Sequence, residues 1–208
     1  MQYSSGLDVA RVKTYAKAVA ARPCHRGDIV VPFPRYLKVG NTAREFVTEL
    51  VPLCGTALDT LESADEVAMT GWLLHAFDSR GCVFDDLLHN AVPFSVATAV
   101  ADVSCDPRLS HPRRILDRRS RISNAGLLGQ LAVFTELLLQ AEWLRLPIAA
   151  DKAKDPEFRD KLILWLDEHS ELLLSFHVLR ELPTVATLLT AVRDAFLYHR
   201  RRGICQRS

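Results

Sequence analysis

The chain has 208 residues, of which 49% are hydrophobic and 25% are charged, a composition typical of a globular protein and not of a disordered one. Its length favours one domain over two, so we expect a single domain over residues 1–208. The formal net charge is only +1, which argues against a general polyanion-binding protein, so any anion site must be local.

The cysteines and the apolar segments indicate the compartment. Five cysteines occur without a Cys-x-x-Cys pair, which argues against a disulfide framework and a zinc ribbon and makes a reducing cytoplasm the simplest expectation. The first residues lack the apolar core of a signal peptide. The longest apolar segment, residues 127–146, is interrupted by polar and charged side chains, so it predicts a buried or amphipathic helix and no membrane span.

The first half of the chain reads as helices. Residues 7–21 have apolar side chains at helical spacing, whereas residues 28–33 are β-like but contain a proline that indicates a loop or an edge piece. Asn41 or Thr42 can cap a further helix. A capping box at residues 63–66 opens the helix that is expected to contain His75.

The second half continues the same pattern. A helix begins near residue 83, and Pro93 breaks or restarts it. Residues 106–124 are polar, rich in arginine and contain two prolines, so we expect a long loop with at most one helical turn. Residues 126–146 are the strongest helix, Asp155 caps the next one, and Pro183 opens the last. The sequence therefore predicts an all-α, single-domain helical bundle of about seven to eight helices.

His75 lies within an apolar run, three residues before a carboxylate. If the helix continues through residue 77, His75 shares a face with Gly71, Trp72 and Asp78, and His75 and Asp78 could bind a common ion. The alternative is a core histidine held by one hydrogen bond.

An acidic pair precedes a second histidine at helical spacing. Asp85 and His89 are four residues apart, and Asp86 and His89 are three apart, so either pair can chelate a divalent ion. The alternative is that both carboxylates simply favour the positive end of the helix dipole in its first turn, with His89 on the surface.

Arginines are concentrated in residues 106–122. The planar guanidinium matches two phosphate oxygens at once, so phosphate binding is the functional interpretation. The alternative is that these arginines pair with carboxylates elsewhere. Aromatic side chains that could stack on bases are absent from this segment, which disfavours nucleic acid. The arginines are Arg108, Arg113, Arg114, Arg118, Arg119 and Arg121.

Several segments, taken in order, resemble the HD-type hydrolase domain of the RelA/SpoT alarmone (ppGpp) hydrolase family. The His25-Arg26 pair is similar to the family's first element, and Leu-Leu-His at 73–75 is similar to its central Leu-Leu-His-Asp. Residues 96–106, followed by the arginines, resemble its Val-x-x-Val-Thr-Asp-Asp segment and basic loop. The resemblance covers about residues 10–175 and implies an HD-domain-like helical fold.

The resemblance also implies a metal site, although this sequence differs from the family at several of the site's positions. Family members bind a divalent ion, usually Mn²⁺, and here His25 and His75 match metal positions, with Glu136 as a substitute carboxylate. The Asp of the His-Asp pair is replaced by Ala76, and only Asp78 remains of the pair that orients the attacking water. A site with fewer ligands holds its ion less well. We therefore expect hydrolase chemistry that is weakened or lost, with Mn²⁺ as the candidate cofactor.

Two functional hypotheses follow. The first is recognition of a phosphorylated guanosine nucleotide such as an alarmone, with Arg26 and the six arginines as phosphate ligands and metal-dependent pyrophosphohydrolase activity reduced or absent. The second is a non-catalytic, antitoxin-like regulatory module whose apolar helix faces bind a protein partner and whose arginines steer an acidic one. The first needs the arginines in a pocket beside His75, and the second needs an exposed apolar patch. Neither involves a membrane or nucleic acid.

Overall fold

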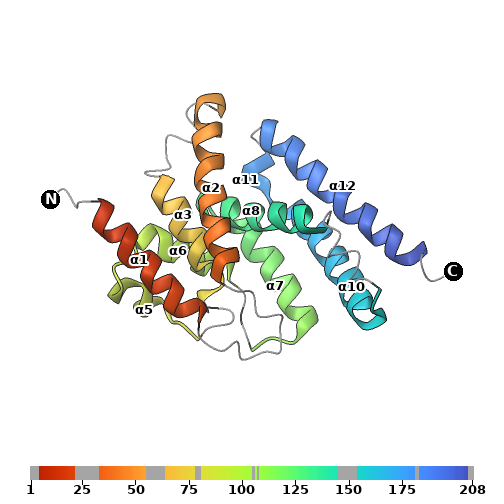
Figure 1. The fold of residues 1–208 in the computed structure, drawn as a ribbon, viewed down its shortest axis with the longest axis horizontal. Coiled ribbons are helices and arrows are strands. Elements are labelled where there is room, and N and C mark those ends of the chain that lie inside the picture. Colours follow the sequence, from red (N-terminus) through yellow and green to blue (C-terminus); the bar gives the residue numbers. More distant parts are fainter. Residues whose placement is uncertain are drawn as a thin grey trace. The chain divides into compact units, whose positions relative to one another are not determined.

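The computed structural model describes residues 5–21, 33–54, 64–77, 81–104, 106, 108–144, 154–180 and 183–205. Within these residues all regular structure is helical, and eight helices have seven residues or more, which confirms the predicted all-α class (Figure 1). The elements are α1 (Ser5–Ala20), α2 (Phe33–Cys54), α3 (Ala64–Leu73), α5 (Phe84–His89), α6 (Phe94–Val103), α7 (His111–Asn124), α8 (Leu127–Leu144), α10 (Pro156–Leu172), the 3-10 turn η2 (Leu173–Ser175), α11 (His177–Arg180) and α12 (Pro183–Cys205).

Helix boundaries agree with the sequence where a local signal defines them. Pro93 is the N-cap residue of α6, and Pro183 is the first residue of α12. The Asp155 carboxylate accepts a hydrogen bond from the Glu157 backbone N–H at 2.9 Å, which satisfies one of the free donors at the start of α10.

Two helices begin or end at residues other than those predicted from the sequence. Helix α2 begins at Phe33, so neither Asn41 nor Thr42 is its cap. Helix α3 ends at Leu73, and His75 lies in the turn that follows it. The helical face expected for His75 is therefore wrong.

The arginine-rich segment is a helix and not the predicted loop. Helix α7 runs from His111 to Asn124 with Pro112 in its first turn, where a missing N–H costs nothing. Ile115 and Ile122 are seven residues apart on one face, and Ile122 is fully buried. Arginine is a good helix former, so α7 is an amphipathic helix with a strongly basic outer face.

The chain divides into two compact units, Met1–Val133 and Phe134–Ser208, and the division falls within α8. The expectation of a single domain over residues 1–208 stays a prediction. The candidate residues fall in both units: His75 and the arginines of α7 belong to the first, and Glu136 belongs to the second.

The first unit has an apolar core formed by α1, α3, α5 and α6. Its buried members include Val12 of α1, Trp72 of α3, Leu87 of α5 and Val96 of α6. Helix α3 is buried on all sides from Val67 to Leu73, whereas α5 and α6 bury one stripe and expose the opposite one.

Helices α2 and α3 cross at Gly40 and Gly71, where their two backbones lie close together. A Cβ atom on Gly71 would lie 2.6 Å from the Gly40 Cα, and one on Gly40 would lie 2.3 Å from the Ala68 backbone oxygen. Only glycine allows the two backbones to approach to this distance. Tyr36 lies one turn before Gly40, and His75 lies four residues after Gly71, so the crossing brings Tyr36 and His75 together.

The second unit is held by aromatic contacts. The rings of Trp165 in α10 and Phe196 in α12 meet edge to face with centroids 5.3 Å apart, and Phe134 meets Phe176 at 6.2 Å. His169 stacks on Trp165 at 3.9 Å, and its Nδ1 lies 2.8 Å from the Trp165 backbone oxygen. His169 is thus a packed core histidine.

Candidate functional site

His75 packs against an aromatic ring of α2. Its imidazole is half-buried, and its centroid lies 5.3 Å from that of Tyr36, with the two planes tilted by 48°. Asp78, His25 and Arg26 lie outside the described residues. The predicted pairing of His75 with Asp78 and the match of His25 to a metal position therefore stay predictions.

Glu136 is a buried carboxylate, 4% exposed. Its Oε1 accepts a hydrogen bond from Gln140 Nε2, one turn later in α8, at 3.3 Å. Glu136 and His75 belong to different units, so a shared ion between them stays a prediction. Within the described ranges, no group of three or more His, Cys, Asp and Glu side chains could hold a metal ion.

The acidic pair of α5, Asp85 and Asp86, lies in the first turn of that helix. Asp86 Oδ2 accepts a hydrogen bond from the Val83 backbone N–H at 3.0 Å, and Asp85 is exposed. His89 is also exposed, and its backbone oxygen accepts a hydrogen bond from Arg11 Nη2 at 3.2 Å. These contacts favour the structural interpretation, in which both carboxylates stabilise the first turn of α5.

Arg108 and Arg121 are held by nearby carboxylates. Arg108 donates from Nε and Nη2 to the two oxygens of Asp106, at 3.0 and 2.9 Å, and its hydrogen bonds lower the pKa of Asp106 from 3.8 to about 2. Arg121 Nε donates to Asp117 Oδ2 at 2.9 Å. The same Asp117 oxygen accepts the Asp106 backbone N–H at 3.1 Å, so Asp117 joins the segment before α7 to the last turn of that helix.

The other arginines form the basic face of α7. Arg114 and Arg118 are one turn apart and both half-buried, whereas Arg113 is exposed. Leu116, 64% exposed, lies beside them. A straight helix presents these side chains on a convex surface, which suits a broad acidic surface better than a small ligand enclosed on several sides.

Exposed apolar side chains lie where α5 meets α6, at positions for which no functional motif was predicted. Phe94 is 69% exposed, Val83 59% and Leu88 38%. The Phe94 ring meets the half-buried Phe84 ring edge to face, with centroids 5.8 Å apart. Leu88 lies one turn after Phe84. These four side chains, Val83, Phe84, Leu88 and Phe94, are called the α5–α6 patch below.

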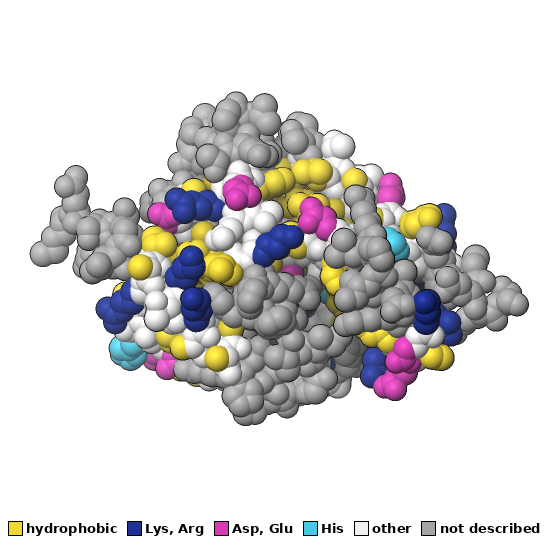
Figure 2. Space-filling view, in the orientation of Figure 1, with side chains coloured by type: hydrophobic (Ala, Val, Ile, Leu, Met, Phe, Trp, Pro, Cys, Tyr) yellow, Lys and Arg dark blue, Asp and Glu magenta, His cyan; other side chains and the backbone are white. Residues whose placement is uncertain are grey.

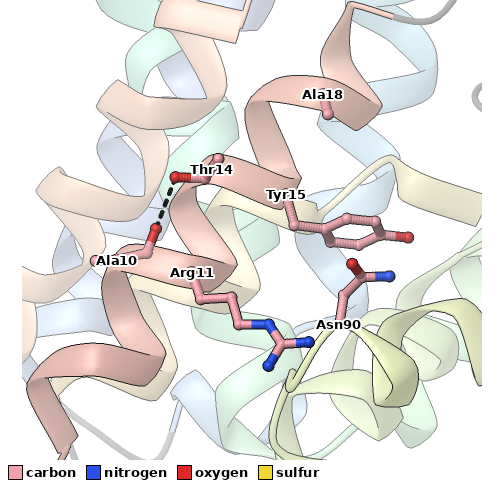
Figure 3. Close-up of a pocket in the computed structure, with 6 residues that line it drawn as sticks. All are labelled: Ala10, Arg11, Thr14, Tyr15, Ala18 and Asn90. Atoms are coloured by element: carbon pink, nitrogen blue, oxygen red, sulfur yellow. Dashed lines mark hydrogen bonds between the residues drawn. The ribbon is translucent and has the colours of Figure 1, made fainter.

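A shallow groove of about 540 Å³ lies beside this patch, between α1 and the turn after α5. Figure 3 shows Arg11 and Tyr15 extending from α1 toward Asn90. Its lining is mostly apolar, and it is called the α1 groove below. It is lined by Ala10, Arg11, Thr14, Tyr15, Ala18 and Asn90.

Comparison of the chain with protein-family models, with curated proteins and with solved structures found no match. The resemblance to alarmone hydrolases therefore stays a prediction. None of the described helices is long and apolar enough to cross a membrane.

Proposed function

We propose that this chain is a non-catalytic helical module that binds a protein partner through the α5–α6 patch. The exposure of Phe94, Val83 and Leu88 carries the proposal. Large apolar side chains scattered singly are normal on a protein surface, but here three lie within twelve residues, at α5 and at the start of α6, and the Phe94 ring contacts that of Phe84. Such a grouping indicates an interaction site.

The position of the α5–α6 patch supports this proposal. Phe94 is the first residue of α6, and Phe84 is the first of α5. Both helices also contribute to the core, through Leu87 and Val96. The patch is thus presented on a packed scaffold, and a partner that covers it gains burial of aromatic surface without ordering a loop.

The test is site-specific photocrosslinking in the cells that express the chain. A photoreactive phenylalanine analogue replaces Phe94 in one variant and Leu164, 53% exposed on α10, in a matched control. We expect one discrete crosslinked product from position 94 and none of that mass from position 164. Equal products from both positions, or none from position 94, would refute the proposal.

A second candidate is recognition of a phosphorylated guanosine nucleotide by the basic face of α7. The observation that favours it is local charge: α7 contains five arginines and one aspartate in a chain of net charge +1. In this proposal Arg113 and Arg114 hold phosphate oxygens, while Arg108 and Arg121 are already engaged by carboxylates.

Thermal-shift measurements with Mn²⁺, guanosine tetraphosphate, both together, and GTP as control test this second candidate. A ligand that binds only the folded state raises stability by about 2.7 kcal/mol at a hundredfold excess over its Kd. We expect a nucleotide shift that Arg113→Glu and Arg114→Glu together remove. A shift that needs Mn²⁺ and is lost in His75→Ala would instead indicate an intact ion site, whose activity a hydrolysis assay would then measure. No shift would refute nucleotide binding.

A further inference from the structure

The α1 groove has cations on both of its sides. At about 100° per residue, Ala10, Thr14 and Ala18 lie along one line of α1, with Arg11 on one side of that line and Lys17 on the other. Figure 2 shows basic side chains gathered over α1 on the face of the molecule that it presents. Arg11 therefore lines the groove, whereas Lys17 lies outside its lining, on the other side of the line of Ala10, Thr14 and Ala18.

These cations have no acidic partner within the described part of the chain. Arg11 donates only to a backbone oxygen, that of His89, and Lys17 is exposed. A third cation of α1, Lys13, makes a cation–π contact, and its Nζ lies 5.6 Å from the centre of the Trp72 ring. Among the described side chains, no carboxylate is paired with Arg11, Lys13 or Lys17.

The small side chains on the floor of the groove would allow a partner helix to approach α1 closely. Ala10 and Ala18 carry only a methyl group, and the Thr14 hydroxyl is turned back to donate to the Ala10 backbone oxygen at 2.9 Å. A helix laid along such a floor can bring its apolar side chains against α1 without a clash.

We propose that the α1 groove seats an acidic amphipathic helix of the partner. Its apolar face would lie on Ala10 and Ala18, and carboxylates on its two flanks would meet Arg11 and Lys17. This inference rests on the proposed function and names the chemistry of the partner's contact surface.

Fluorescence anisotropy with two synthetic peptides tests it on the full-length chain. One probe is an 18-residue amphipathic helix, about 27 Å long, with leucine on one face and glutamate on both flanks. The other has lysine in place of every glutamate. Each is titrated against the wild type, Lys17→Glu, Ala18→Trp and the matched control Arg201→Glu, since Arg201 is an exposed cation of α12.

We expect the acidic peptide to bind and the lysine peptide not to bind. Lys17→Glu should weaken binding of the acidic peptide at least fivefold, because an attraction becomes a repulsion, and Arg201→Glu should not change it. Ala18→Trp should abolish binding by filling the groove without altering its charge. Higher salt should weaken binding by the wild type.

Three outcomes would overturn the inference: no binding of the acidic peptide, equal binding of both peptides, or acidic-peptide binding that Lys17→Glu and Ala18→Trp leave unchanged. Lys17-dependent binding to phosphatidylserine vesicles, with no peptide binding, would also overturn it and assign the cations to a lipid surface. In each case photocrosslinking at Phe94 judges the proposed function separately, because it reports on the patch and not on the groove.

Discussion

Replacing Gly71 with alanine tests the close crossing of α2 and α3. The new Cβ would lie 2.6 Å from the Gly40 Cα and 2.7 Å from the Gly40 nitrogen. Both are backbone atoms, so no side-chain rotation relieves the clash and the two helices must move apart. Overpacking of this kind costs about 1–3 kcal/mol, and a backbone obstacle favours the upper end of that range.

Helix propensity works in the opposite direction. Alanine is better than glycine inside a helix by about 1 kcal/mol, so we expect a net loss of about 2 kcal/mol in the free energy of unfolding. For a chain of this size the midpoint temperature should fall by about 4–8 °C. The fall is measured by circular dichroism during heating and by urea titration.

Gly126 provides the matched control, because nothing lies within 4 Å of a Cβ built there. Gly126 directly precedes α8, and its backbone oxygen accepts the Gln130 N–H. Gly126→Ala should therefore leave stability nearly unchanged, because the loss of a favoured N-cap residue offsets the lower entropy of the unfolded chain. If Gly71→Ala is as stable as the wild type, the described contact between α2 and α3 is wrong, and so is the explanation for the meeting of Tyr36 and His75.

Three further predictions concern single side chains. Asp155→Ala removes the cap of α10 and should cost about 1 kcal/mol of unfolding free energy, whereas Asp155→Ser should restore most of it; equal stability of the two variants in urea titration would contradict the capping role. Because the pKa of Asp106 is lowered from 3.8 to about 2, its contribution to stability is present above pH 3.8 and lost as the pH falls toward 2. Asp106→Asn should thus be less stable than the wild type at pH 6, and the gap between their urea midpoints should shrink between pH 4 and pH 2; a constant gap would refute the pairing with Arg108. Phe94→Asp should lower stability by at most about 1.5 kcal/mol, the upper value for an aromatic pair, and should reduce binding of an apolar fluorescent dye; a larger loss of stability would mean that Phe94 belongs to the core.

The sequence predicted helix boundaries well where a local signal sets them. Pro93, Asp155 and Pro183 act within one turn of their own position, so their effect can be predicted without the rest of the fold. The end of α3 at Leu73 had no such signal. Continuing the helix to residue 77 therefore gave the wrong helical face for His75.

The arginine-rich segment shows how charge can obscure a helix. Its two prolines and many arginines suggested a loop, but Pro112 falls in the first turn, and the half-buried Ile115 and the buried Ile122 share one face. Counting the apolar positions seven residues apart would have indicated α7.

The α5–α6 patch also left a partial signal. Val96, Val100 and Val103 share one face of α6, and all three are buried. Phe94 falls on the opposite face by helical periodicity, which predicts exposure. The contact between the Phe84 and Phe94 rings, in contrast, depends on how α5 and α6 pack, and the crossing at Gly40 and Gly71 depends on which helices become neighbours. Neither can be derived from a single sequence.

The size of the chain's native assembly tests the central proposal most directly. Extracts of the cells that express the chain are separated by size exclusion, and the elution of the wild type is compared with that of Phe94→Asp and of Leu164→Asp. The proposal predicts that the wild type and Leu164→Asp elute well above the 23.3 kDa of the chain, and that Phe94→Asp elutes at that mass. Elution of all three proteins together, or a shift only in Leu164→Asp, would contradict partner binding through the α5–α6 patch.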